Sequence, residues 1–177
     1  PSAKEDLIFD SYTRSIYNGY ATQSYSKLKN VILYFIEKCD NVFNTKMNKL
    51  LFYADFLSYK TYGRGMTGLA YRAIQFGPVP VRWDRVYSLI DGVYPEMVEF
   101  SSGICGTKLC SDLSPDCSSF TAEELSILEK VLDIFKSTSA SQISELSHSE
   151  EAWTKYCNTA QMISYNEAFT LKAFDIS

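Results

Sequence analysis

Apolar residues recur every three or four positions along much of the chain, which is the spacing of amphipathic helices. The clearest stripe lies within residues 44–62, at relative positions i, i+3, i+4, i+7 and i+10 (Met47, Leu50, Leu51, Ala54 and Leu57). Asn44 is a residue type that caps a first helical turn, and Gly63 can adopt the left-handed conformation that ends a helix. We therefore expect a long helix from residue 44 to residue 62.

Further stripes predict a helix over 4–17, a second over 24–39 and a short one within 83–90. Two capping boxes mark the starts of two more helices, because in each the paired side chains satisfy amides that the helix leaves open (Thr121 with Glu124, and Ser139 with Gln142). Shorter helical segments are expected after Ser147 and within 163–174.

Strand signals are fewer. Residues 69–76 are rich in β-branched and aromatic side chains, which favours a strand. The Gly-Pro-Val-Pro segment at 77–80 predicts an abrupt turn, because proline lacks an N–H and restricts the residue before it. Alternating patches within 93–119 predict two short strands that join the first in one antiparallel sheet.

The expected fold class is therefore α+β and predominantly α, with a small antiparallel sheet of about three short strands. We expect residues 1–177 to form a single domain, with its core at about 25–170 and an N-terminal helix at 4–17. The composition, 46% hydrophobic and 21% charged, is that of an ordinary globular protein.

Charge and cysteine content narrow the function classes. A net charge of −4 argues against nucleic-acid binding, which normally requires a basic face, although a cluster of arginines leaves contact with an acidic partner open (Arg72, Arg82 and Arg85). Five cysteines without a secretory context favour reduced thiols in a cytoplasm. No apolar run approaches the roughly 20 residues that a membrane span needs.

Catalytic and metal-binding patterns are sparse. His148 is the only histidine. One interpretation is a catalytic base that its neighbouring glutamates poise. The interpretation that we favour is a structural hydrogen bond at a helix start. Cys105, Cys110 and Cys117 lack the paired spacing of a zinc site. The glycine-rich segment 63–68 follows a helix and precedes a strand, unlike a phosphate loop. We expect no enzyme activity, no cofactor and no metal.

Two motifs follow one another along the chain. The first comprises Lys49-Leu50-Leu51-Phe52-Tyr53-Ala54-Asp55, then Tyr62-Gly63, then Tyr71-Arg72-Ala73-Ile74-Gln75-Phe76-Gly77-Pro78-Val79-Pro80. The second comprises Leu146-Ser147-His148 with Trp153. Together they resemble the Panacea domain, also called the SocA-like antitoxin-associated domain. Its members show a Lys-Leu-Leu-Tyr-Tyr-Ala-like helix, a strand ending in Tyr-Gly-Pro-Val and a Leu-(Ser/Thr)-His-x-x-x-x-Trp element. The resemblance covers roughly residues 25–170.

This resemblance implies function through a partner. Such domains occur in type II toxin–antitoxin systems, where they bind a toxin protein and neutralise it, so we expect a cytoplasmic antitoxin domain without enzyme activity. The alternative is a proteolytic adaptor or phage-derived (prophage) regulatory module that delivers a partner to a AAA+ protease, as SocA itself does with its toxin.

The resemblance also bears on DNA binding. Some members, including some classed with the MqsA/YgiT antitoxins, carry an N-terminal zinc and helix-turn-helix part that binds DNA and regulates transcription. This chain begins Pro-Ser-Ala rather than with Met and has no paired Cys-x-x-Cys motif. We therefore expect it to correspond to the C-terminal part of such a protein, with any DNA binding belonging to an absent N-terminal part.

The candidate protein-binding residues lie in or near the motifs. Aromatic side chains on a rigid base are typical of interface hot spots, and the anchors proposed on that ground are Tyr53, Tyr59, Tyr62, Phe76 and Trp83. Polar contacts are expected from Asp55, Arg72 and His148. For each of these residues the competing interpretation is that it stabilises the fold instead.

Overall fold

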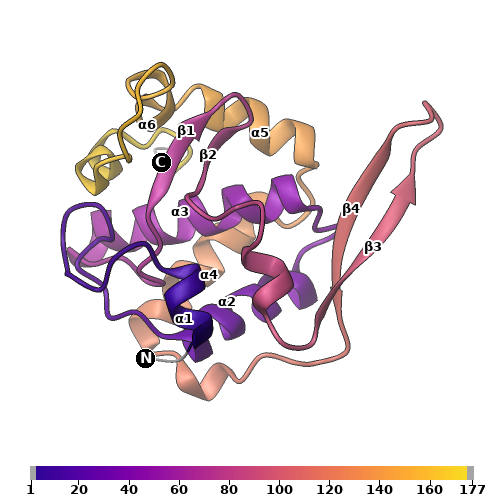
Figure 1. Ribbon diagram of the computed structural model, residues 1–177, viewed down its shortest axis with the longest axis horizontal. Coiled ribbons are helices and arrows are strands. Elements are labelled where there is room, and N and C mark those ends of the chain that lie inside the picture. The colour runs from indigo at the N-terminus through magenta and orange to yellow at the C-terminus, as the bar shows by residue number, and fades with distance from the viewer. Residues whose placement is uncertain (1–2, 175–177) are drawn as a thin grey trace.

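The computed structural model describes residues 3–174, and its central element is α3 (Asn44–Tyr62). This helix crosses the middle of the molecule, with other elements on every side of it (Figure 1). Every residue from Lys46 to Ser58 is buried, including charged ones, and α3 contacts α2 (Tyr25–Lys38), α4 (Ala122–Phe135) and α5 (Ala140–His148). A helix buried on all faces belongs to the interior of a protein, so α3 is the axis of the core.

Most helix boundaries agree with the sequence signals. Both capping boxes are present, at the starts of α4 and α5, and Gly63 ends α3 with a φ of 74°. The prediction for Asn44 was wrong, because Phe43 occupies the N-cap position of α3 and makes no side-chain cap bond. The remaining helical elements are short (α1, Ala3–Ile8; η1, Val86–Leu89; η2, Cys117–Ser119; α6, Glu151–Thr154; η3, Tyr165–Thr170).

The N-terminal helix is shorter than the predicted span of 4–17, since α1 ends at Ile8. Beyond it the chain turns around Asn18, whose side chain accepts from the Ser15 N–H and donates to the Thr13 carbonyl. Short polar side chains of this kind compete with the helix for backbone hydrogen bonds. The apolar stripe alone did not reveal that competition.

The α+β, predominantly α fold class is confirmed, but the strands form two separate hairpins instead of one three-stranded sheet. β1 (Tyr71–Ile74) pairs with β2 (Gly77–Pro80), and β3 (Val93–Glu99) pairs with β4 (Cys105–Ser111). The free edge of β1 is taken by the C-terminal segment, where the Ile163 N–H donates to the Tyr71 carbonyl at 2.8 Å. A third strand therefore has no place to add at that edge.

The Gly-Pro-Val-Pro segment was expected to be a turn and is strand β2. The Val81 N–H donates to the Ala70 carbonyl, and hydrogen-bonding positions alternate along an antiparallel strand. Pro78 and Pro80 consequently fall on positions where the ladder needs no N–H, and proline is tolerated there. The turn itself lies at residues 75–76, one step earlier than predicted.

One hydrophobic core joins residues from Ile8 to Ala173. Figure 1 shows the helices and the β1–β2 hairpin gathered around α3, with the β3–β4 ribbon extending away from them. Among the described residues, no helix is long and apolar enough to cross a membrane.

Gly77 gives a direct test of the hairpin packing. Its φ is +98°, and a Cβ there would lie 2.7 Å from the Cε of Lys49 and 2.9 Å from the Oγ of Ser147. We expect Gly77→Ala to lower the free energy of unfolding by about 3 kcal/mol, from the left-handed backbone plus overpacking. Gly103→Ala is the matched control, because Gly103 has a φ of +84° but open space around it, and should cost only about 1 kcal/mol. Urea denaturation of both variants measures the difference, and equal costs would contradict close packing at Gly77.

Candidate protein-binding site

The separate parts of the first motif meet in space through the buried carboxylate of Asp55. Its Oδ1 accepts from the backbone N–H groups of Met66 (2.8 Å) and Thr67 (2.6 Å). Its Oδ2 accepts from the Thr67 hydroxyl (2.5 Å) and the Tyr71 hydroxyl (2.6 Å). Complete burial raises the pKa of Asp55, and these four hydrogen bonds offset part of that rise. Asp55 thereby fixes the loop after α3 and the start of β1 against the central helix.

The backbone amides of the glycine-rich loop are used in hydrogen bonds within the protein. Two of its amides bind Asp55, and the Gly65 N–H donates to the Gly19 carbonyl at 2.8 Å. A phosphate loop presents such amides to its ligand, so this segment is a structural connection, as the sequence order indicated.

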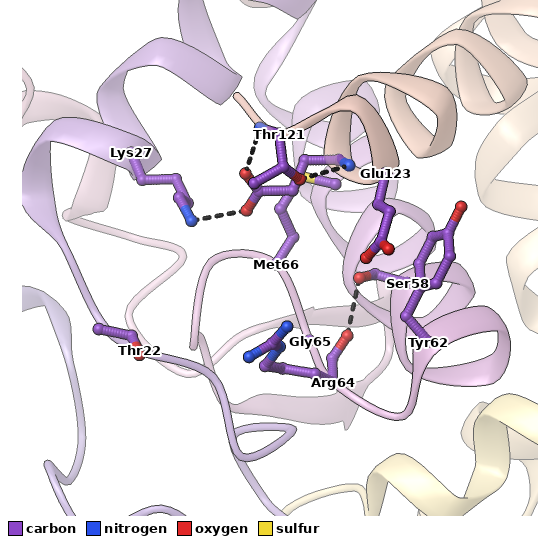
Figure 2. Close-up of a pocket in the computed structure, with 10 residues that line it drawn as sticks. Thr22, Lys27, Ser58, Tyr62, Arg64, Gly65, Met66, Thr121 and Glu123 are labelled. Atoms are coloured by element: carbon purple, nitrogen blue, oxygen red, sulfur yellow. Dashed lines mark hydrogen bonds and ion pairs between the residues drawn. The ribbon is translucent and has the colours of Figure 1, made fainter. Parts of the chain in front are cut away.

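A small cavity of about 210 Å³ lies beside this loop, next to Tyr62 and Arg64 (Figure 2). The polar groups around it largely bind one another. Lys27 forms an ion pair with Glu124 at 2.6 Å, and the Ser58 hydroxyl donates to the Arg64 carbonyl at 2.7 Å. The first contact joins α2 to α4 and the second joins α3 to the loop that follows it, so both hold the walls of the cavity in place.

Side chains of the second motif hold the β1–β2 hairpin in place. The Trp153 indole N–H donates to the Ile74 carbonyl at 2.6 Å. The two ring nitrogens of His148 lie 3.0 Å from the Gln75 carbonyl and 2.6 Å from the Ser144 carbonyl. Carbonyls only accept and a neutral imidazole has one N–H, so both contacts are complete hydrogen bonds only when the ring is protonated. His148 therefore pins the hairpin turn to the end of α5.

Lys49 lies under the same hairpin. It is fully buried, and its Nζ has no hydrogen-bond partner among residues 3–174. Burial lowers the pKa of this amine from 10.5 to about 7. Lys46, one turn earlier, is equally buried, but its Nζ donates to the carbonyls of Asp40 and Lys136. The two lysines differ in whether their charge is compensated.

The predicted binding residues divide by exposure. Tyr53 and Asp55 are 0% exposed, so neither offers a surface to a partner in this structure. Arg72 donates to the Ala160 carbonyl and ties β1 to the C-terminal segment. Phe76 and Tyr62, in contrast, are 49% and 40% exposed.

Ring contacts sort the accessible aromatic residues into two groups. Phe76 and Trp83 meet at the hairpin turn, with centroids 5.9 Å apart. Tyr59 meets Phe169 at 5.9 Å, near the end of α3 where Tyr62 also lies. Phe169 is 62% exposed and was missed from the sequence, where it stands in a tail without a motif. The structure thus presents two aromatic surfaces and places His148 beside the first.

A buried carboxylate, a hairpin held by Trp153 and His148, and the exposed Phe76 ring at the hairpin turn characterise this α+β domain. Comparison with family models agrees with the resemblance seen in the sequence. The model of the family described as "Antitoxin SocA-like, Panacea domain" matches residues 47–154. This is more than half of the 177 residues, and the chain belongs to the SocA-like Panacea family.

Searches of curated proteins and of solved structures found no match to the chain. Family membership supports a role in toxin–antitoxin systems in general. The relation to the MqsA/YgiT antitoxins stays a prediction.

Removing the Asp55 carboxylate tests the central network. Asp55→Ala leaves two buried N–H groups and two hydroxyls without their acceptor, and we expect a loss of about 3–5 kcal/mol in the free energy of unfolding. Tyr71→Phe removes only one of the four bonds and should cost about 1 kcal/mol. Chemical denaturation measures both. Similar costs for the two variants would contradict a network centred on Asp55.

Lys49 predicts a pH dependence of stability. Since its pKa is about 7 when folded and 10.5 when unfolded, the unfolded chain binds more protons between these values, and stability rises with pH there. From pH 7 to 8.5 we expect the free energy of unfolding to rise by about 1–2 kcal/mol.

The Lys49→Met variant should abolish this rise and be at least as stable as the parent at pH 7. Lys46→Met should keep the rise while losing stability, because it leaves two carbonyls unpaired. Denaturant titrations at both pH values provide the measurement. A rise that survives in Lys49→Met would assign it to another group.

Proposed function

We propose that this chain is an antitoxin domain that binds a cognate toxin protein and neutralises it by direct contact, without catalysis. Membership of the SocA-like Panacea family supports a toxin–antitoxin role, and one structural observation supports binding as its means. Phe76, which is 49% exposed, contacts the half-buried Trp83 at a hairpin turn that lies inside the family-matched segment.

The rigidity of that turn favours an interface. Two consecutive backbone carbonyls at its start, those of Ile74 and Gln75, are held by Trp153 and His148, and Gly77 packs against Lys49 and Ser147. Aromatic anchors on an ordered base lose little conformational entropy on binding, which is why hot spots concentrate on them. The aromatic pair is therefore our proposed anchor, with His148 as a neighbouring polar contact.

Other residues of the predicted set enter this proposal differently. Asp55 and Arg72 act through the fold by holding strand β1 in place, and Tyr53 does so by packing against Phe135 and Phe174. Tyr59 and Tyr62, with Phe169, form the second aromatic surface, and we rank it below the hairpin because it lies at the end of the helix and not in a pinned turn.

We also propose that residues 1–177 act as one domain, since a single hydrophobic core draws on side chains from Ile8 to Ala173. The toxin and this domain would meet in the cytoplasm, where the five cysteines remain free thiols.

Co-expression with the protein encoded beside its gene tests the function. The expected result is rescue of growth and a complex that survives purification. Binding without rescue would indicate a proteolytic adaptor instead of a neutralising antitoxin, and no binding would contradict the proposal.

Substitutions then test the anchor. Phe76→Ala should weaken the complex by at least about tenfold, because a hot-spot residue contributes about 2 kcal/mol or more. Phe169→Ala is the matched control, being an even more exposed phenylalanine in the other aromatic group. Calorimetry of the purified pair measures both. A loss of affinity confined to Phe169→Ala would instead assign the interface to the end of α3.

A further inference from the structure

Strand β3 of the β3–β4 ribbon is mostly exposed. Figure 1 shows the ribbon leaving the helical body with β4 nearer to that body and β3 on the outer side. The base of β4 is attached through the Leu109 N–H, which donates to the Val42 carbonyl at 2.9 Å. On β3, by contrast, Met97 is 66% and Tyr94 45% exposed. The ribbon has one attached strand and one open strand.

The register shows which backbone groups of β3 point outward. Leu109 pairs with Pro95, and because the Leu109 N–H turns toward Val42, this is a pair whose groups face away from each other. Alternate residues share this orientation, so Met97 and Glu99 also direct their N–H and carbonyl groups to the outer edge. These groups have no backbone partner within residues 3–174. Such an edge is a template for an added strand.

A cavity of about 140 Å³ adjoins this edge, between the ribbon and the segment before η1. Asn44, Trp83, Asp84 and Pro95 are among its lining residues. Asn44, one of these lining residues, has a buried Oδ1 that lacks a partner among the described residues. Trp83 also contacts Phe76, so one lining residue of the cavity belongs to the proposed aromatic pair.

Charge indicates what can occupy the edge. β3 carries Glu96 and Glu99, whereas β4 carries one cation, Lys108, which lies opposite Glu96, so the two strands together keep a net negative charge. Two copies paired through β3 would bring four glutamates together and lack the N–H of each Pro95, which disfavours self-association. A segment with lysine or arginine side chains would instead meet a strand pair of net negative charge.

We propose that the outer edge of β3, with the adjoining cavity, is a strand-addition site for an extended, lysine- or arginine-bearing segment of a protein partner. This inference rests on the proposed function, for which it names a second contact region and the chemistry of the segment bound there.

Variants of the edge test the inference with the protein encoded beside the gene. Met97→Pro removes an outward N–H without breaking the β3–β4 ladder, and should weaken binding by about tenfold. Met97→Ala keeps that N–H and is its control, with a smaller expected loss. Circular dichroism and thermal unfolding confirm that both variants stay folded.

Charge reversal is the second variant. Glu96→Lys with Glu99→Lys should also weaken binding by about tenfold, and by less as salt is raised. Glu123→Lys with Glu129→Lys, two exposed glutamates on α4, is the matched control for net charge. An equal loss in that control would overturn the charge argument.

Peptide probes test the site without the partner. We would add a capped Lys-Val-Lys-Val-Lys peptide or its Glu-Val-Glu-Val-Glu counterpart and follow the amides of Met97 and Glu99 by NMR. The lysine peptide should shift these signals and slow their hydrogen exchange, and the glutamate peptide should not. Equal effects of both peptides, or shifts centred elsewhere, would overturn the inference.

The two proposals fail separately. If the wild-type chain does not bind the neighbouring protein, the proposed function is wrong, and the peptide experiment still decides the strand site. If Phe76→Ala abolishes binding and Met97→Pro leaves it unchanged, the function stands and the β3 edge is not used. A dimer in sedimentation that Met97→Pro dissociates would make a second copy the occupant and contradict the inference.

Discussion

The fold depends on a carboxylate held in the middle of its core. Asp55 is wholly buried on a helix that is itself enclosed, and it accepts four hydrogen bonds from the loop and strand that follow the helix. An isolated charge in such a place is strongly unfavourable, so the surrounding donors must stay where they are. Asp55 thereby sets the path of the chain from Gly63 to Tyr71, and through it the position of the β1–β2 hairpin.

Polar groups of the same core differ in how far they are compensated. Lys46 donates to two carbonyls, whereas the Nζ of Lys49 has no hydrogen-bond partner among the described residues. Burial therefore lowers the pKa of Lys49. The hairpin that covers Lys49 carries Phe76 at its turn and is held there by His148. Most of the motif residues therefore hold the β1–β2 hairpin in position. A few motif side chains, such as Phe76, point outward from it.

Local features of the fold were predictable from the sequence because they depend on neighbours a few residues away. The Thr121 and Ser139 capping boxes and the Gly63 helix end are of this kind, and all three are present. The family was recognisable too, since its motifs are contiguous runs. The failures had non-local causes: the tail at Ile163 occupies the edge of β1, and the prolines of β2 fall on positions that need no donor.

The sequence by itself determined the family, the α+β class, the long central helix and a set of aromatic and polar candidates. Only the tertiary structure decided which candidates are interior, such as Tyr53 and Asp55, and which reach the surface, such as Phe76. Periodicity distinguishes the faces of a half-buried helix, but α3 is enclosed on every side, and the periodic signal then carries no information about exposure. The separation of the β3–β4 ribbon from the body likewise depends on which strand edges are already occupied, and that is settled by residues far apart in the chain.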